Sequence, residues 1–555
     1  MRLSSTHSAE PLAQLLDEYV SYLHETNPTI AGLDGIHEYD DLLEDPSKEA
    51  IEAQIRELGG WSRRLEGIHA STLTSGEKRE RKVLADSIRA RLFQLEQIRP
   101  WQSNPLHYAE TLATSLSSQV LFNYAPVSER ARRLVSKLRQ VPRFLDAAQE
   151  NISDPPGLFV RVGLESFEGV LLFVERDLPK VFRNLDDMHI LGDLADASTL
   201  ASNALRNYLV HLRDTVAPRS RASFRLGADR FSTKLQLEEG IAISAQQLLE
   251  IASGELQEKK DEFRSVASEL AGGATGAWET LKGRHPSADE LLAVAEGQLN
   301  ALLTFIRRKR LMKVPEHPFP IVAPTPDFYR WTFASLWSAG PFESKSLPAY
   351  YYVTNVDPSW AADKQEQHLR DLNEASLWSI SMHEVFPGHF LHAEHLRLLE
   401  NPLRKSNLFA PVSVTEGWAH YCEQMMLEEG FERGNKEIRL GQLSESLLRL
   451  ARTVVGIRLH TEDLSVEQGV RFFQEEAFLE EGTARQEAER GTFDASYVMY
   501  SIGKHMLNKL RTDYKSKMGE KFSLGAFHNQ FLSQGVLPFW LHRELMLGDV
   551  GTLIE

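Results

Sequence analysis

"SMHEVFPGHFLH", residues 381–392, is the stretch of this chain that most constrains how the rest must fold. It contains the pair His383-Glu384 and, six positions after the first histidine, His389. In the usual zinc-hydrolase pattern His-Glu-x-x-His, the two imidazoles are four residues apart and share one helix face, since four positions differ by only about 40°. Six positions differ by about 240°. A regular helix therefore cannot let His383 and His389 bind one ion.

The gap between the two histidines holds Pro387 and Gly388. A proline cannot donate the intrahelical hydrogen bond, and a glycine tolerates unusual dihedral angles. We therefore expect the helix to widen or break at Pro387-Gly388, which brings His389 toward His383. The alternative is a junction of two helices that carry histidines without a metal, because the spacing permits a site but does not require one.

A third ligand is offered by "TEGWAHYCEQMM", which begins 26 residues after His389 and has a helical pattern. Glu416, His420 and Glu423 fall at i, i+4 and i+7, within about 60° of one another on one face. A carboxylate from this helix completes a two-His, one-Glu set, which leaves the fourth position open as in catalytic zinc sites. Glu384, beside the first ligand, is then the expected general base. The alternative is that each is an ordinary residue on a half-exposed helix.

Composition limits the class of protein. The chain has 555 residues, 42% of them hydrophobic and 25% charged, as in ordinary soluble globular proteins. It has no apolar run of transmembrane length and no secretory pattern near its start, so we expect cytoplasmic residence without a membrane. Its single cysteine, Cys422, excludes an internal disulfide framework and a thiolate-rich zinc site. A net charge of −16 makes nucleic acid an unfavourable partner.

Most of the chain repeats apolar residues at three- and four-residue steps, which is typical of helices. Residues 314–360 differ, since 8 of the 24 prolines fall there and residues 347–356 are aromatic and β-branched, which predicts a short strand. The alternative is a proline-rich connector between helical lobes. Glycine-rich residues 272–278 are expected to form a loop. We predict a mainly α, two-lobed fold with a cleft and a small β-sheet beside the active-site helix. The N-terminal helical lobe would span 1–313 and the catalytic lobe 314–555, unless both form one continuous domain.

The two central motifs, "HEVFPGH" followed by "EGWAHYCE", resemble the pattern of the DUF885 family. That family is similar, at a distance, to the gluzincin metallopeptidases, including helical zinc carboxypeptidases and oligopeptidases. The resemblance covers nearly the whole chain, through residues 27–43, 340–355, 491–511 and 522–538. It implies that His383, His389 and Glu416 bind Zn²⁺ and that Glu384 is the base.

This sequence departs from the family pattern at two places. The family often has Gln at the position of His392, which here adds a spare imidazole three residues after His389. It also often has Asp-Pro where this chain has Asp494-Ala495, which bears on the loop near Tyr497. Whether His392 or His420 contributes to the metal site therefore stays open.

The C-terminal block should supply the donor that stabilises an oxyanion, a role for which a phenol is suited. The candidates are Tyr500 first, Tyr497 second and His528 third. The alternative for each is a place in the core with only the polar atom satisfied. Arg485 and Lys504 are candidates for holding a substrate carboxylate, or else serve at the surface.

Together these features predict a zinc-dependent hydrolase that cleaves amide bonds, above all peptide bonds, by metal-activated water with Glu384 as the general base. One alternative is a metal-dependent hydrolase of a non-peptide, small-molecule amide, since the motif fixes the chemistry and leaves the pocket open. Another is a non-catalytic helical binding protein on the same fold, against which the intact Glu384 argues. The substrate, the choice between exo- and endopeptidase action, and the oligomeric state are not determined by the sequence.

Overall fold

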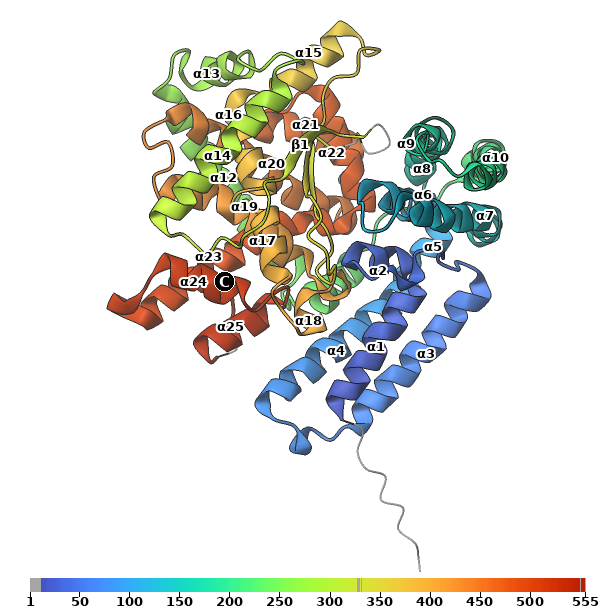
Figure 1. Ribbon diagram of the computed structural model, residues 1–555. Coiled ribbons are helices and arrows are strands. Elements are labelled where there is room, and N and C mark those ends of the chain that lie inside the picture. Colours follow the sequence, from blue (N-terminus) through green and yellow to red (C-terminus); the bar gives the residue numbers. More distant parts are fainter. Residues whose placement is uncertain (1–10, 327–329, 331, 550, 555) are drawn as a thin grey trace, which may run out of the picture. The chain divides into compact units, whose positions relative to one another are not determined.

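The computed structural model describes residues 11–326, 330, 332–549 and 551–554. The chain is mainly helical with one small sheet, as predicted (Figure 1). Helix contacts divide it into two compact units. The first comprises Met1–Ser223 with the short segments Phe342–Lys345 and Ser406–Phe409, and the second comprises Phe224–Pro341, Ser346–Lys405 and Ala410–Glu555. The cleft between lobes stays a prediction.

The first unit is built of helices joined by short turns. α1, α3 and α4 pack together, and the long helices α7 and α10 lie side by side (Figure 1). The main helices are α1 (Leu12–Thr26), α2 (Pro28–Asp34), α3 (Lys48–Gly67), α4 (Ser75–Phe93), α5 (Pro100–Ser103), α6 (Pro105–Leu121), α7 (Val127–Asn151), α8 (Gly157–Leu172), α9 (Leu178–Val181) and α10 (Met188–His211).

Local sequence signals set several of these helix ends. Thr74 and Glu77 form a reciprocal capping box at the start of α4, which satisfies two backbone donors that the helix itself leaves unpaired. Pro28 and Pro105 stand in the first turns of α2 and α6, where the missing N–H costs nothing. These signals can be read from sequence, so most helices were predictable.

The second unit carries the predicted site. Its first helices are α11 (Ala228–Lys234), α12 (Ala245–Ser268), α13 (Gly273–Lys282) and α14 (Leu291–Lys309). After the strands come α15 (Ala362–Asp371), α16 (Glu374–Glu384), α17 (His389–Leu396), α18 (Pro402–Lys405), α19 (Val412–Glu428), α20 (Lys436–Thr461), α21 (Val466–Ala477), α22 (Glu481–Phe493), α23 (Met499–Met518), α24 (Leu524–Leu532) and α25 (Phe539–Leu547). One apolar core joins α14, α16, α19 and α23 to the sheet.

The sheet has three short strands in the order β1-β3-β2. β1 (Ile321–Pro324) runs parallel to β3 (Tyr350–Val353), and β2 (Ala334–Trp337) runs antiparallel to it. The central strand β3 lies within the predicted strand segment. Its Tyr351 hydroxyl is 3.2 Å from the Ser381 hydroxyl of α16, so the sheet does lie beside the helix that bears His383.

Two details differ from the sequence-based expectation. The contacts divide the chain at Ser223–Phe224, whereas the expected lobes met at 313/314. The reason is that α12 packs on α20, and α14 packs on α16, so α11–α14 bury their apolar faces in the second unit. The glycine-rich stretch 272–278 is not a loop, because α13 begins at Gly273 and the Trp278 ring packs edge-on against Phe263.

Among the helices of the described residues, none combines the length and the apolar composition needed to cross a lipid bilayer.

Candidate metal centre

The predicted helix break is present between the two histidines. α16 ends at Glu384 and α17 begins at His389, and the Phe386–Pro387 peptide bond is cis. The rings of His383 and His389 lie on either side of this break and meet nearly at right angles, with their centroids 4.8 Å apart. Glu416, on α19, completes the group. One ligand atom from each of the three side chains lies within 4.8 Å of the other two.

The two distances from Glu416 to the histidines match those between ligands of a tetrahedral metal ion. Nε2 of His383 and Nε2 of His389 are each 3.3 Å from the same oxygen, Oε2 of Glu416. Ligands at zinc bond lengths of about 2.1 Å in a tetrahedral arrangement are about 3.4 Å apart. A charge-assisted hydrogen bond is shorter, about 2.7–2.9 Å. Oε2 of Glu416 is buried, yet it makes no hydrogen bond of acceptable geometry. The three donors therefore fit a zinc ion better than they fit one another.

Close backbone packing fixes the turn between the histidines. A Cβ atom on Gly388 would lie 1.7 Å from the carbonyl oxygen of His383, so only glycine fits there. The Gly388 N–H donates to the Met382 carbonyl at 3.0 Å, and the Trp418 indole N–H donates to the Pro387 carbonyl at 3.1 Å. The last bond ties the turn to α19, which carries Glu416.

α19 is itself held in place at its start and along its length. The buried Glu239 carboxylate accepts the backbone N–H of Val412 at 3.2 Å and that of Ser413 at 2.9 Å, which satisfies two free donors of the first turn. Further along, a Cβ atom on Gly417 would lie 2.6 Å from the backbone of Gly503 in α23. These contacts define both the start and the rotation of the helix that presents the carboxylate ligand.

His383 is oriented from behind by a second carboxylate. Its Nδ1 lies 2.7 Å from Oε1 of Glu423, which leaves Nε2 to face Glu416. The Ser379 hydroxyl donates to the other oxygen of Glu423 at 2.9 Å, and an Nη atom of Arg449 lies 3.2 Å from Oε1. Metal-binding histidines commonly donate their other ring N–H to a carboxylate, which fixes the tautomer. Glu423, expected only as one member of the α19 stripe, has this supporting place.

The charges of this group are strongly perturbed. Burial and the Arg449 charge act to lower the pKa of His383, but its close contacts with the Glu416 and Glu423 carboxylates outweigh them and raise it to about 9. Burial acts to raise the pKa of Glu416, yet the His389 charge and the two imidazole contacts hold it well below its usual range. These contacts favour a protonated His383, and a metal cation would have to displace that proton to bind.

Glu384 and Tyr500 border the group without belonging to it. Glu384 is the last residue of α16 and is partly exposed, and it lies outside the set of converging ligand atoms. The Tyr500 ring is nearly parallel to the His383 ring, with 6.3 Å between centroids. Burial, followed by the Glu416 charge, raises the pKa of Tyr500 to about 12, although Arg490 and Arg452 lower it. Tyr500 is thus a protonated donor beside His383.

The other two oxyanion candidates have places in the core. Tyr497 is 1% exposed. Its hydroxyl packs so closely on Gly491 that a Cβ atom added to this glycine would lie 2.1 Å from the hydroxyl oxygen. His528 is fully buried and both its ring nitrogens are engaged, Nε2 with the Tyr421 hydroxyl at 2.8 Å and Nδ1 with the Leu311 carbonyl at 2.8 Å. The geometry therefore favours Tyr500.

The two spare histidines lie outside the ligand group. His392 is buried, and burial together with the charge on His389 lowers its pKa to about 3. His420 is fully buried with Nδ1 3.3 Å from Glu423, a contact too poorly aligned for a hydrogen bond. Of the two proposed carboxylate-holding cations, Arg485 is a half-buried residue paired with Glu467 at 2.6 Å. Lys504 is buried, with Nζ 3.4 Å from the Ser446 hydroxyl.

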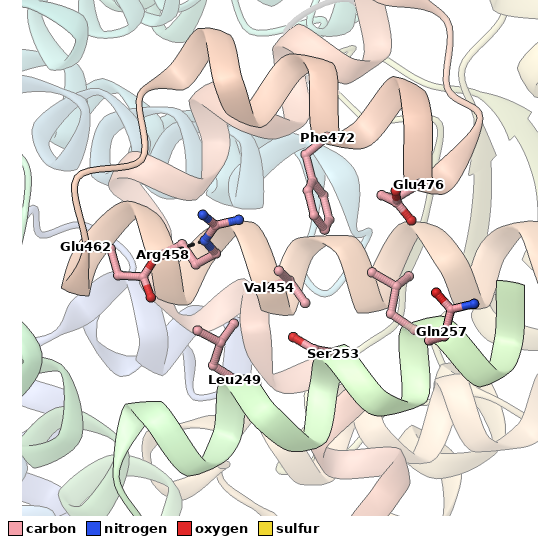
Figure 2. Close-up of a pocket in the computed structure, with 9 residues that line it drawn as sticks. Leu249, Ser253, Gln257, Val454, Arg458, Glu462, Phe472 and Glu476 are labelled. Carbon is pink, nitrogen blue, oxygen red and sulfur yellow. Dashed lines mark hydrogen bonds and ion pairs between the residues drawn. The ribbon is translucent and has the colours of Figure 1, made fainter.

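A separate hollow of about 390 Å³ lies between α12, α20 and α21 (Figure 2). An ion pair of Arg458 with Glu462 lies at one end of it, at 2.9 Å. Since no metal ligand is among the residues that line it, we locate the candidate site by converging donor atoms and not by volume. The lining residues are Leu249, Ser253, Leu256, Gln257, Val454, Arg458, Glu462, Phe472 and Glu476.

Sequence reasoning missed three arginines around the site. Arg452 binds Glu487 through two hydrogen bonds of 2.7 Å, and its guanidinium lies 5.2 Å from the centre of the Tyr500 ring. Arg490 lies within hydrogen-bonding reach of the Tyr500 hydroxyl. Arg449 supports Glu423. The sequence did carry one signal for them, since Arg449 and Arg452 lie within the apolar helix α20. Charged side chains in such a helix are buried only when they are paired, which indicates carboxylate partners nearby.

Comparison with solved structures identifies the same fold in two bacterial proteins. One, from Shewanella oneidensis, is described as "a putative lipoprotein of unknown function"; it is 24% identical, and the match covers 97% of this chain and 100% of that one, with a TM-score of 0.79. The other, described as "the putative lipoprotein from Colwellia psychrerythraea", is 18% identical over 97% of this chain and 98% of its own, with a TM-score of 0.80. None of the curated proteins compared with the chain matches it.

The family comparison agrees with the motifs. A model described as "Bacterial protein of unknown function (DUF885)" matches residues 28–546, which include most of both units and every residue of the candidate metal centre. This chain belongs to the DUF885 family.

Proposed function

We propose that the protein is a zinc-dependent hydrolase that cleaves amide bonds, with peptide bonds as its substrates. The observation that carries this proposal is the convergence of His383 and His389 on one oxygen of Glu416, at 3.3 Å from each, with Glu384 directly adjacent but outside the ligand set. Three protein ligands with an open fourth position are typical of catalytic rather than structural zinc sites.

His383, His389 and Glu416 would hold the zinc ion, which when bound would supply Lewis acidity to a water molecule and to the carbonyl of the scissile amide. Glu384 accepts the proton of the attacking water and passes it to the leaving nitrogen, which is the general acid–base role. It suits this role because it follows His383 directly in the chain, at the end of α16. Its carboxylate is not consumed as a ligand.

Tyr500 donates a hydrogen bond to the oxyanion that develops from the carbonyl. Its raised pKa of about 12 keeps the phenol protonated at neutral pH, so the hydroxyl hydrogen is available. Arg490, within hydrogen-bonding reach of the Tyr500 oxygen, can only donate to it, which favours a hydroxyl hydrogen that points elsewhere. Arg452, over the ring, restricts the position of the phenol.

The test separates metal binding from catalysis. The zinc-loaded protein and its Glu384→Gln variant are compared on a peptide library, after the metal content of both has been measured. We expect equal metal content, since Glu384 is not a ligand, and a fall in turnover of about 100- to 10,000-fold, since the water loses its proton acceptor. Equal turnover by the two proteins, or no cleavage by either, would contradict the proposal.

A further inference from the structure

A second cluster of titratable groups lies in the first unit, remote in sequence from the metal ligands. It forms where two family-signature stretches meet, residues 27–43 and 340–355. His37 lies between two carboxylates. Its Nδ1 is 2.8 Å from Oδ2 of Asp40, and its Nε2 is 2.8 Å from Oε2 of Glu343. The imidazole also stacks on the Tyr124 ring, with 3.7 Å between centroids and 6° between planes.

This geometry requires the charged form of His37. A neutral imidazole has one N–H and one bare nitrogen, so it can donate to only one of two flanking carboxylates. The imidazolium donates to both. Burial alone would lower the pKa of His37, but the hydrogen bonds to Asp40 and Glu343 outweigh it and the pKa is raised.

The two hydrogen bonds differ in their support. Asp40 is 1% exposed and also accepts a hydrogen bond from Arg133 at 3.0 Å. Burial acts to raise the pKa of Asp40, but the hydrogen bond from His37 helps to lower that pKa to about 2. Glu343 accepts the backbone N–H of Lys345 with its other oxygen, at 2.9 Å. When His37 loses a proton, the remaining one stays on Nδ1 to serve the deeper, doubly held Asp40. Glu343 then loses the donor.

The other charged groups around His37 have hydrogen-bond or ion-pair partners of their own, and the Lys345 charge also acts on Glu343. Arg133 pairs with Asp40 and Glu129. The Lys345 ammonium donates to the Tyr124 carbonyl. Burial lowers the pKa of Lys137, whose Nζ donates to the Ser115 carbonyl and hydroxyl at 3.1 and 2.9 Å. Deprotonation of Lys137 would remove a positive charge near Asp40, which favours the imidazolium and so acts against the loss of the clamp.

We infer that His37 is a pH-dependent clamp that fixes residues 342–345 onto the N-terminal signature stretch when it is protonated and loosens them when it is not. Because the folded state holds the proton more tightly, the clamp is complete below the ordinary histidine range, near pH 6.5, and is lost as pH rises above it. The clamped segment ends five residues before β3 begins at Tyr350. The inference uses no metal and does not depend on the proposed hydrolase activity.

Hydrogen–deuterium exchange of the full chain at pH 6 and pH 9 tests this clamp, with observed rates divided by intrinsic rates to remove the chemical pH effect. We expect protection of residues 340–349 to fall by about tenfold or more at pH 9, as for loss of a charged hydrogen bond. Protection of α3 in the same unit, which contains no histidine, should stay constant. A wild-type segment equally protected at both pH values would overturn the inference.

Variants make the test specific. His37→Gln should leave residues 340–349 weakly protected at both pH values, without a pH-dependent step. Glu343→Gln supplies a carboxamide, which accepts from the imidazolium and can donate to the bare nitrogen of the neutral ring, so the segment should be protected to a similar degree at both pH values. The matched control is His69→Gln, at an exposed position of the same unit, which should reproduce the wild-type curve. A pH-dependent step that persists in His37→Gln would assign the loosening to another group.

Discussion

Replacing Glu423 by glutamine should weaken zinc binding without removing any ligand. Glu423 is fully buried, and its Oε1 lies 2.7 Å from Nδ1 of His383. A glutamine carbonyl can still accept the Nδ1–H, so the ring keeps its tautomer and orientation. The negative charge that makes the imidazole a stronger ligand is lost. Arg449 retains its ion pair with Glu445 at 2.7 Å, so the buried guanidinium is not left uncompensated.

The expected size follows from what each substitution removes. Loss of a supporting carboxylate behind a metal-binding histidine weakens affinity by about 10- to 100-fold. Glu423→Gln keeps the hydrogen bond and loses only the charge, so we expect about tenfold, or about 1.4 kcal/mol. Glu423→Ala loses both and should approach 100-fold, or about 2.8 kcal/mol.

The assay is a competition for zinc between the protein and a chelating dye at fixed pH. Glu428→Gln is the matched control, because Glu428 is an exposed residue at the end of the same helix whose pair with Arg511 is 3.1 Å long. It should bind zinc like the parent. If Glu423→Gln also binds like the parent, or if Glu428→Gln is weakened equally, the carboxylate does not tune His383 and the reasoning fails.

Three further outcomes are expected. Gly388→Ala should abolish zinc binding in the same dye assay, since its Cβ would lie 1.7 Å from the His383 carbonyl. The control is Gly254→Ala, in open space on α12, which should bind zinc normally. Its free energy of unfolding should rise by about 0.5–1 kcal/mol. Tyr500→Phe should keep its zinc but lower kcat by about 100-fold or more, and an unchanged kcat would exclude it as the oxyanion donor. Burial raises the pKa of Asp371 from 3.8 to about 6, so the folded state loses stability as pH rises through that window and the carboxyl becomes charged. In urea unfolding, Asp371→Asn should raise the free energy of unfolding by up to about 3 kcal/mol at pH 7 and leave it unchanged below about pH 4.

The local part of the site was predictable because it rests on backbone chemistry. Pro387 and Gly388 cannot continue a regular helix, so the break between His383 and His389 followed from their identity. The face of α19 that presents Glu416 followed from helical spacing alone. The small sheet beside α16 followed from proline density and β-branched residues.

The remainder depended on contacts between distant segments. Helical periodicity shows that α12 and α14 each bury one face but not which partner covers it, so the division at Ser223–Phe224 was not predictable. The order of Tyr500, Tyr497 and His528 required knowledge of which one borders His383. Glu423 supports His383 from behind and is not among the converging ligand atoms. This role depends on how α19 packs against α16, which sequence spacing does not determine.

The central claim is that His383, His389 and Glu416 hold one zinc ion. Metal analysis of the purified parent protein, of His383→Ala and Glu416→Ala, and of Glu384→Gln tests it most directly. We predict about one zinc per chain in the parent and in Glu384→Gln, and almost none in the two ligand variants, because two protein ligands are too few for a stable site. Full zinc content in both ligand variants, with the fold intact by circular dichroism, would contradict the account.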